Sequence, residues 1–252
     1  MFSLKELTKN FGGLRAVDKL TFDVKEGSIT ALIGPNGSGK STVFNIISGI
    51  LLPSSGSIYL GNRIIKGLRP HEISNLGISR TFQELRIFNN LTVIENVMVG
   101  LRTLTKSGMI SSMLRFPKER QERKLLRERA EYLLELLGII DKSDMMPNDL
   151  PYAVQRMVDI ARALANEAKI ILLDEPVAGM NPREAEDLSG ALMRIKKEVC
   201  PTIFLIEHNM KFVMNLSDHV GVLNYGRLLA EGAPEKIMNS EEVIRAYLGE
   251  VG

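Results

Sequence analysis

A glycine-rich segment at residues 34–41 has the residue types and the spacing of a phosphate-binding loop. Its sequence, Gly34-Pro35-Asn36-Gly37-Ser38-Gly39-Lys40-Ser41, matches the pattern G-x-x-x-x-G-K-[ST]. Glycines let successive backbone N–H groups converge on phosphate oxygens, and the N-terminus of a following helix adds a favourable dipole. Lys40 would then place its charge on the β- and γ-phosphates, and Ser41 would give Mg²⁺ a hydroxyl ligand. The alternative is a tight turn without a ligand, and a chance match is expected in roughly 1% of chains of this length.

Two carboxylates end an apolar run later in the chain. The run from Ile170 to Leu173 has the composition of a buried strand, and Asp174 and Glu175 follow it directly. Because ligands bind beyond the carboxyl ends of the strands in a parallel sheet, we expect this pair to face the glycine-rich loop. Asp174 suits the Mg²⁺ shell, and Glu175 suits a general base that polarises an attacking water. An Asp-Glu strand end is common by itself, and it gains this meaning only beside the loop.

Two further polar residues stand at comparable places. His208 follows the apolar run from Thr202 to Ile206, so we expect it at the same sheet edge and in contact with the γ-phosphate, although a lone histidine is more often structural. Gln83 closes another short strand, and its amide could reach both Mg²⁺ and the water. His71 and His219 have no such context, and we expect them to be ordinary residues.

Strands and helices must bring these residues together. Apolar runs separated by turns predict strands at 20–24, 29–33, 170–173 and 202–206, and a closing hairpin at 219–223 and 227–230. Helical spacing follows the glycine-rich loop from Lys40 to Ser48, and it returns between about Pro182 and Lys197. A strand that runs into the loop, followed by a helix, is the context that makes a phosphate-binding loop credible.

The middle of the chain has a different character. Little strand pattern is present from about Asn90 to Leu137, and residues 115–137 are charged and helical, with leucines on one face. We interpret this stretch as a helical insertion in a strand-rich domain. Its basic residues between Arg115 and Arg129 could touch lipid headgroups, but acidic residues alternate with them, which favours a solvated helix face.

Composition sets wider limits. The chain has 252 residues, of which 44% are hydrophobic and 25% charged, as in a soluble globular protein. A net charge of +2 gives no indication of nucleic-acid binding. The single cysteine, Cys200, cannot form an internal disulfide, which agrees with a reducing compartment and with a small apolar filler beside a strand. No secretion signal and no run of ~20 apolar residues is visible, so a role at a membrane would need another chain as the anchor.

Together these motifs resemble the ATP-binding subunits of ABC transporters over nearly the whole chain. The resemblance implies an α/β fold with a RecA-like P-loop NTPase core formed by residues 1–88 and 160–252. It also implies an antiparallel β subdomain and an inserted helical subdomain at about residues 89–159.

The same resemblance implies a role for each site residue. Phe11 takes the position of the aromatic that stacks on adenine, Gln83 that of the glutamine loop, and His208 that of the switch histidine. The segment from Pro176 to Pro182 resembles the loop that communicates across the dimer. The residues implied for ATP binding are Phe11, Gly34, Pro35, Asn36, Gly37, Ser38, Gly39, Lys40, Ser41 and Thr42. Those implied for Mg²⁺ are Ser41, Gln83 and Asp174. Those implied for catalysis are Glu175, His208, Gln83 and Lys40.

A narrower resemblance is to the LivG type of branched-chain amino-acid uptake proteins. It is carried by Phe11 to Val17, by Arg80 to Gln83, by the long insertion from Arg102 to Arg123 and by the tail from Tyr247 to Glu250. Uptake systems for urea or short-chain amides share much of this pattern, so they stay open as alternatives.

One segment departs from the family. The signature motif Leu-Ser-Gly-Gly-Gln stands here as Leu150-Pro151-Tyr152-Ala153-Val154. Proline replaces the serine hydroxyl and lacks an N–H, and alanine restricts the close backbone approach that glycine permits. Since this motif normally donates hydrogen bonds to the γ-phosphate on the opposite subunit, its change handicaps the partner's site and not this chain's own.

The family also implies partners and a location. We expect a dimer of two ATPase subunits, identical or different, that powers an integral membrane permease and depends indirectly on a solute-binding protein. The chain would lie peripherally at the cytoplasmic face of the cell membrane, with ATP and Mg²⁺ as ligands and no nucleic acid. The alternatives are a soluble ABC-type ATPase of DNA repair or translation, whose coiled-coil arms or tandem cassettes are not visible here, and a non-hydrolysing module that assembles on ATP.

Overall fold

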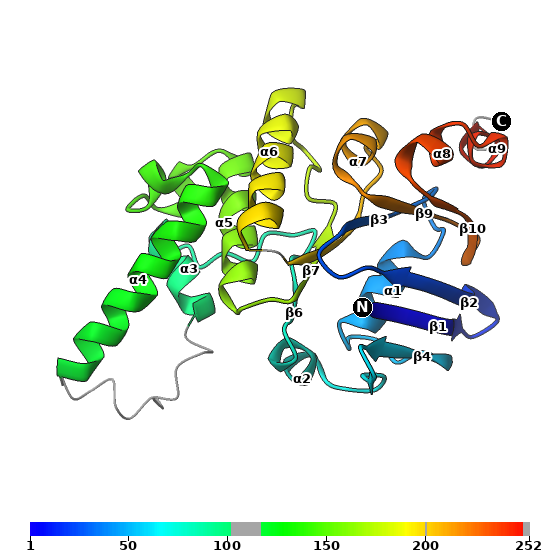
Figure 1. The fold of residues 1–252 in the computed structure, drawn as a ribbon, viewed down its shortest axis with the longest axis horizontal. Helices are drawn as coiled ribbons and strands as arrows, with labels where there is room; N and C mark the ends of the chain where they lie inside the picture. The colour runs from blue at the N-terminus through cyan, green and yellow to red at the C-terminus, as the bar shows by residue number, and fades with distance from the viewer. Residues whose placement is uncertain (102–116, 200, 249–252) are drawn as a thin grey trace.

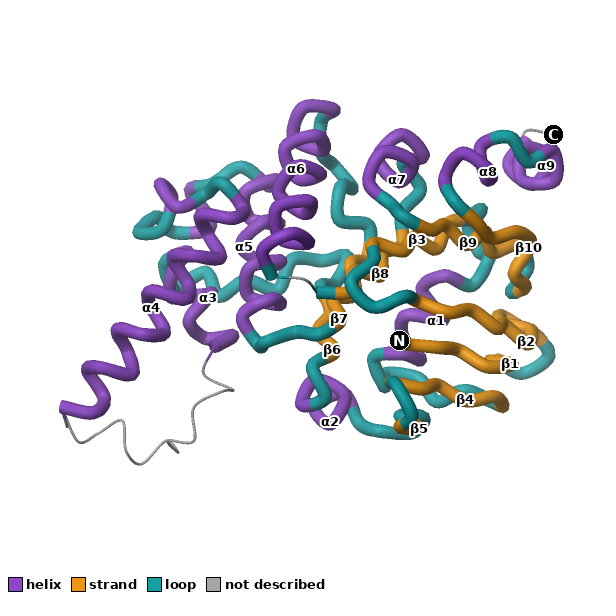
Figure 2. Tube along the Cα trace, in the orientation of Figure 1, coloured by secondary structure: helices purple, strands orange, loops and turns teal. Residues whose placement is uncertain are grey.

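The computed structural model describes residues 1–101, 117–199 and 201–248. Helices gather at one end of the molecule and strands at the other, and the C-terminal helices cover the strand-rich end (Figure 1). Two sheets carry the fold, one of six strands and one of four (Figure 2). The α/β class predicted from the sequence is therefore confirmed. Among the described helices, none combines the length and the apolar character that a membrane span requires.

The six-stranded sheet has the order β10-β9-β3-β8-β7-β6. Its strands are β3 (Ile29–Ile33), β6 (Ile78–Arg80), β7 (Ile170–Asp174), β8 (Thr202–Ile206), β9 (His219–Asn224) and β10 (Arg227–Gly232). All neighbours pair in parallel except β10 with β9. Each residue of β3, β7 and β8 is buried, as expected for parallel strands that are covered on both faces.

The four-stranded sheet is antiparallel and has the order β2-β1-β4-β5. Its strands are β1 (Phe2–Phe11), β2 (Leu14–Val24), β4 (Ser55–Leu60) and β5 (Arg63–Ile64). Only the apolar end of β2 could be predicted from the sequence, because polar residues are mixed with apolar ones through β1 and the start of β2. That alternation suits a sheet with only one covered face.

Nine α-helices and two 3₁₀ turns are present in the described part of the chain. They are α1 (Lys40–Ile47), α2 (Pro70–Asn75), α3 (Val93–Leu101), α4 (Pro117–Leu137), α5 (Tyr152–Ala165), α6 (Pro182–Glu198), α7 (Met210–Leu216), α8 (Pro234–Met238), α9 (Glu241–Leu248), η3 (Ile140–Lys142) and η4 (Pro147–Asp149). Helix α6 begins in a capping box: the Asn181 side chain accepts from the backbone of Arg183 and Glu184, and the Glu184 carboxylate accepts from the backbone of Asn181.

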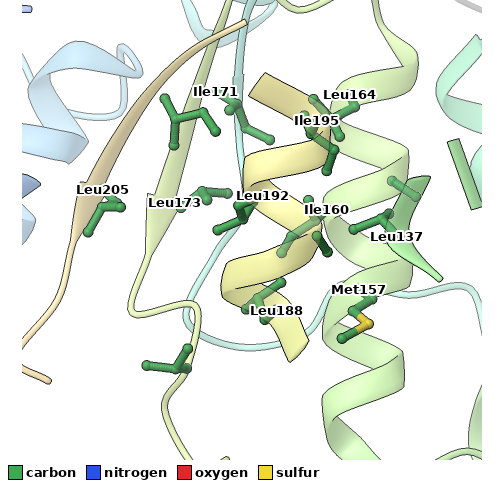
Figure 3. Close-up of a cluster of buried hydrophobic side chains, with 14 of the residues drawn as sticks. Leu137, Met157, Ile160, Leu164, Ile171, Leu173, Leu188, Leu192, Ile195 and Leu205 are labelled. Atoms are coloured by element: carbon green, nitrogen blue, oxygen red, sulfur yellow. The ribbon is translucent and has the colours of Figure 1, made fainter. Parts of the chain in front are cut away.

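The two faces of the six-stranded sheet build separate cores. On one face, Ile29, Ala31 and Ile33 of β3 join a cluster that includes α5, α6 and α7. Figure 3 shows α6 packed between strands β7 and β8 on one side and α5 on the other. On the opposite face, Leu32 joins α1 and the antiparallel sheet. The alternation of β3 side chains between the two cores fixes the strand, and with it the loop that follows Ile33.

The predicted elements agree closely with the structure. The strands at 29–33 and 202–206 are confirmed in full, and the helices after the loop and after Pro182 differ from α1 and α6 by one residue at their ends. Gln83 differs from its expected position, because β6 ends at Arg80 and Gln83 lies three residues further on in a loop. Cys200 and residues 102–116, the largest part of the 102–123 insertion, lie outside the described residues.

Candidate active site

The predicted site residues follow four adjacent strands. The glycine-rich loop follows β3, His208 follows β8, Glu175 follows β7 and Gln83 follows β6. These strands are neighbours in the order β3-β8-β7-β6 and all run parallel, so their carboxyl ends share one edge of the sheet. The residues are separated by up to 168 positions in the sequence, from Lys40 to His208, and the topology alone brings them to one place.

The glycine-rich loop needs glycine at its two ends. Gly34 has φ +149°, and a Cβ there would meet the carbonyl oxygen of Leu223 at 2.0 Å. Gly39, which precedes α1, has φ +105°, and a Cβ there would meet the carbonyl oxygen of Ala16 at 2.4 Å. Both positions therefore combine a backbone conformation that side chains disfavour with a close approach of main chain. The loop is wedged between β2 and the end of β9.

Lys40 is the first residue of α1, and its side chain turns back over the loop. Its Nζ donates to the carbonyl oxygens of Gly34 at 2.6 Å and Pro35 at 2.8 Å, and it lies 3.4 Å from Ser38 Oγ. The residue is only 8% exposed. The ammonium group is thus held at the centre of the loop, where the backbone N–H groups and the N-terminus of α1 also favour an anion.

Three of the predicted catalytic side chains meet at Glu175. Gln83 Nε2 donates to Glu175 Oε2 at 3.1 Å, and His208 Nδ1 lies 3.8 Å from Glu175 Oε1. The His208 side chain is 60% exposed and that of Glu175 is 23% exposed, so the pair borders solvent at the sheet edge. The carboxylate therefore lies between an amide and an imidazole, with access to water.

Glu175 also has an unusual backbone. Its φ is +47°, in the left-handed region that residues other than glycine rarely adopt. The conformation is held by the Glu175 N–H, which donates to the carbonyl of Ile206 at 2.9 Å. Such strained residues cluster at functional sites, where the surrounding structure enforces them. The turn directs the chain away from β7 immediately after Asp174.

Sequence reasoning missed Glu207, which organises the loops around Glu175 and His208. Its side chain is fully buried, and its two oxygens accept from the backbone N–H groups of Val177, His208 and Asn209 at 2.9–3.1 Å. Where strands end, backbone N–H groups lose their partners in the sheet, and a buried carboxylate can accept their hydrogen bonds instead. A signal was present, because an acidic residue at the end of an apolar run needs buried partners.

Arg80 is the second missed residue. Its Nη2 donates to Asp174 Oδ2 at 2.8 Å, and its Nη1 donates to Asn45 Oδ1 and Ser48 Oγ at 2.8 Å each. The Arg80 and Asp174 side chains are 8% and 9% exposed, so this ion pair is buried. It joins β6, β7 and α1 behind the site, and it fixes one oxygen of the carboxylate that was predicted to bind Mg²⁺.

Phe11 lies at the end of β1 and is 44% exposed, with Lys9 Nζ 5.0 Å from its ring centroid. Its hairpin partner, β2, is tied to the glycine-rich loop through the β9–β10 turn. Asp18 N–H donates to the carbonyl of Gly226 at 2.8 Å, and Gly226 N–H donates to the carbonyl of Ser38 at 2.9 Å. The predicted adenine platform and the phosphate loop are therefore connected by a short run of backbone hydrogen bonds.

Asp18 reinforces this junction with its side chain, which is 8% exposed. Its Oδ2 accepts from Arg227 Nε at 2.7 Å and Nη2 at 2.6 Å, and its Oδ1 accepts from Arg15 at 3.1 Å. The hydrogen bonds from Arg227, followed by those from Arg15, hold the pKa of the Asp18 carboxyl below its ordinary value. A shared carboxylate thus joins β2 to β10.

The altered signature segment lies at the N-terminus of α5. Pro151 is the cap residue and makes no side-chain cap hydrogen bond, and Gln155 Nε2 donates to the carbonyl of Leu150 at 2.9 Å. Tyr152 is 41% exposed and packs beside Gly179, in the loop between β7 and α6. Two segments that are separate in the sequence, 150–154 and 176–182, are therefore neighbours in the fold.

The family of the chain follows from comparison with known proteins. A family model described as ABC transporter matches residues 17–178, and one described as branched-chain amino acid ATP-binding cassette transporter matches residues 227–252. The high-affinity branched-chain amino acid transport ATP-binding protein LivG of Salmonella typhimurium is 41% identical and covers 99% of this chain and 98% of its own. The protein BraF of Pseudomonas aeruginosa, with a similar description, is 39% identical and covers 97% and 96%.

Solved structures agree with these relatives. An ATP-binding cassette of an ABC transporter in its ADP conformation superimposes with a TM-score of 0.85 at 32% identity, over 99% of this chain and 98% of its own. A bacterial ABC transporter cassette solved as a dimer gives a TM-score of 0.77 at 28% identity, over 93% and 99%. The expected RecA-like P-loop fold is thereby confirmed. The chain belongs to the ABC transporter ATPases, the ATP-hydrolysing subunits of these transporters, in the group of the LivG and BraF proteins.

Proposed function

We propose that the chain hydrolyses ATP to power the uptake of branched-chain amino acids through a separate membrane permease. The site assignment rests on one observation: Gln83 and His208 both lie beside Glu175, at the same sheet edge as the glycine-rich loop. The solute follows from the relatives, which are described as branched-chain amino acid transport proteins. Those descriptions favour amino acids over urea or short-chain amides.

Lys40 and the loop would hold the phosphates of ATP. The ammonium group already lies against the loop carbonyls of Gly34 and Pro35, so phosphate oxygens would replace weaker acceptors with charged ones. Ser38 and Gly39 would present backbone N–H groups, and Phe11 would stack on the adenine. The partly exposed Phe11 ring supports this role, because stacking needs an open aromatic face.

Ser41, Asp174 and Gln83 would hold Mg²⁺. They offer hydroxyl, carboxylate and amide oxygens, which are the hard donors this ion prefers, with the remaining positions left to phosphate and water. Arg80 bonds Oδ2 of Asp174, so the ion would use the other carboxylate oxygen. When bound, Mg²⁺ neutralises charge on the phosphates.

Glu175 would accept the proton of the attacking water. Phosphoryl transfer depends on positioning and on charge stabilisation, with little covalent work for the protein. The Gln83 amide donates to one oxygen of Glu175, and the His208 ring lies near the other oxygen. Both side chains are therefore already directed toward the Glu175 carboxylate. His208 would contact the γ-phosphate from the neighbouring strand end. Residues 1–88 and 160–252 would act as the catalytic core, with residues 89–159 as the helical subdomain.

The working form would be a dimer at the cytoplasmic face of the membrane. A cassette of similar fold is described as dimeric. The family resemblance implies that the segment Leu150–Val154 would face the second subunit. The permease would dock on residues 84–97, and a solute-binding protein would act through the permease.

The test replaces Glu175 by Gln, which preserves the shape of the side chain but cannot accept the proton. ATP affinity should stay within about twofold, while turnover should fall by roughly 10²-fold or more. Lys40→Ala is the matched variant, since it should weaken ATP binding by about 1.5–3 kcal/mol or more through loss of a charge-assisted hydrogen bond. Turnover near that of the unaltered protein in Glu175→Gln would remove Glu175 from its proposed role.

A further inference from the structure

Arg156 is a buried arginine that no part of the mechanism above uses. It lies on α5, four residues after Tyr152, and it is fully buried at 0% exposure. Its Nη1 donates to the carbonyl of Phe82 at 2.5 Å, and its Nη2 donates to the carbonyl of Gln83 at 2.6 Å and to the hydroxyl of Tyr152 at 2.8 Å. One guanidinium therefore joins the Gln83 loop to the signature segment.

The loop that carries Gln83 depends on this arginine. Residues 81–88 belong to no strand or helix, so their carbonyls have no ladder of backbone partners. Burying a guanidinium is costly unless its N–H groups are paired. Here the planar fork meets two consecutive carbonyls, an arrangement that a single ammonium group cannot reproduce. The cost of burial is offset by three hydrogen bonds, two of them to the main chain at Phe82 and Gln83 and one to the Tyr152 hydroxyl, while the Nε of Arg156 has no hydrogen-bond partner among the described residues.

The charge of Arg156 also interacts with an acidic residue on its own helix, Asp159. Asp159 lies three residues on and is 3% exposed, and its Oδ1 accepts from Arg162 Nη2 at 2.6 Å. Burial raises the pKa of the Asp159 carboxyl, although Arg162 and Arg156 favour its charged form. Arg156 makes no hydrogen bond to Asp159, although Asp159 Oδ2 has no partner in the described part of the chain, and its hydrogen bonds go to the carbonyls of Phe82 and Gln83 and to the Tyr152 hydroxyl.

We propose that Arg156 is the positioning residue for Gln83, and that the Tyr152 hydroxyl links this position to the signature segment. The bonded path runs from Tyr152 to Arg156, to the Gln83 main chain, and from the Gln83 amide to Glu175. In the proposed dimer, on which this inference rests, Tyr152 faces the nucleotide of the partner subunit and Gln83 faces the nucleotide of its own. The path therefore couples the two sites.

The test compares Arg156→Lys, which keeps the charge but loses the fork, with Tyr152→Phe, which removes one hydroxyl. Arg194→Lys is the matched control. Arg194 on α6 also donates to a backbone carbonyl, that of Leu136 on α4, and this contact involves no residue of the candidate active site. Arg156→Lys should lower kcat by about tenfold to a hundredfold, the effect of a small misplacement of a reacting group. ATP affinity should be unchanged, and the Mg²⁺ concentration for half-maximal rate should rise.

The decisive measurement is made in a Gln83→Ala background. If Arg156 acts through Gln83, Arg156→Lys should cause no further loss of kcat there, because the two changes remove the same interaction. The same non-additivity, with a smaller loss, is expected for Tyr152→Phe. That second variant decides the question if Arg156→Lys lowers the unfolding temperature by more than Arg194→Lys does. Additive losses for both variants would overturn the inference.

A readout without hydrolysis separates this inference from the proposed function. Backbone hydrogen exchange in the peptide that covers residues 81–88 should accelerate in Arg156→Lys and stay unchanged in Arg194→Lys. Absence of hydrolysis in the unaltered protein with its partner would refute the proposed function, while exchange would still report on the loop. Exchange that is equal in both variants would refute the role of Arg156.

Discussion

Arg80 Nη2 lies 2.8 Å from Asp174 Oδ2, and the two side chains form a buried ion pair directly behind the candidate Mg²⁺ site. The pair joins two neighbouring parallel strands, β6 and β7, and Arg80 also bonds Asn45 on α1 and Ser48 at the C-terminal cap of that helix. One oxygen of the carboxylate that would bind the metal is thus fixed by an arginine of the neighbouring strand.

Removal of Arg80 should therefore destabilise the fold. Arg80→Met leaves Asp174 as an unpaired buried charge, which should lower the free energy of unfolding by about 3–5 kcal/mol. The double variant Arg80→Met with Asp174→Asn should recover part of that loss, because no charge is then left unpaired. Urea unfolding of the single and double variants measures both effects. Strictly additive losses would show that the pair contributes no coupling energy.

Partial restoration of the signature motif, with Tyr152 kept, should speed hydrolysis at the site that this segment faces. Pro151→Ser, Ala153→Gly and Val154→Gln together should raise the rate by roughly 10²–10³-fold, by analogy with oxyanion-stabilising groups. Serine is a preferred helix cap, so the start of α5 should tolerate it. In a homodimer the total rate should rise.

In a heterodimer the same restoration should accelerate only the partner's site. Hydrolysis at the partner's site is measured alone when this chain carries Glu175→Gln, because that change should stop hydrolysis at this chain's own ATP site. Equal rates with and without the restored motif, in both kinds of dimer, would mean that the departure has no functional effect.

The docking of the permease can be tested at a groove beside the Gln83 loop. A cavity of about 680 Å³ is lined in part by Phe82, Arg86 and Phe88, and the Phe88 ring is 49% exposed. Because apolar side chains line this cavity, a segment of another protein could bury apolar surface there. Phe88→Cys, with Cys200→Ser to remove the native thiol, should crosslink to a cytoplasmic loop of the permease. A cysteine at Ile244 in α9 is the control, and preferential crosslinking there would contradict the assignment.

Stability should depend on pH through Asp18. Its pKa is lowered in the folded state, chiefly by hydrogen bonds from Arg227, so its stabilising effect is present above its ordinary pKa of 3.8. The effect is lost as pH falls through the lower folded-state pKa. The difference in unfolding free energy between the unaltered protein and Asp18→Asn should be constant near neutral pH and should shrink below about pH 4.

The control for that experiment is Asp23→Asn, at an exposed pair with Lys5. Exposed pairs contribute about 0–1 kcal/mol, so this variant should differ little from the unaltered protein. Chemical denaturation across the pH range measures both. A difference for Asp18→Asn that persists undiminished in acid would contradict the linkage.

Features of this protein that have a local cause could be predicted from its residues alone. Continuous apolar runs predicted β3, β7 and β8, because burial on both faces of the sheet leaves few polar positions in such a strand. The spacing of glycines before Lys40 predicted the loop, since its backbone conformation restricts the residues that can form it. Parallel topology then predicted that Glu175 and His208 share an edge.

The side chains that hold these residues in place are set by the way the helices and strands pack against one another. Arg80 and Asp174 are 94 positions apart, and Arg156 and Gln83 are 73 positions apart, so no local pattern links them. Their pairing depends on how β6 and β7 align and on how α5 packs against the loop after Arg80. A buried charge pairs with a group that the fold places within hydrogen-bond distance. Which group that is depends on the packing of the whole chain.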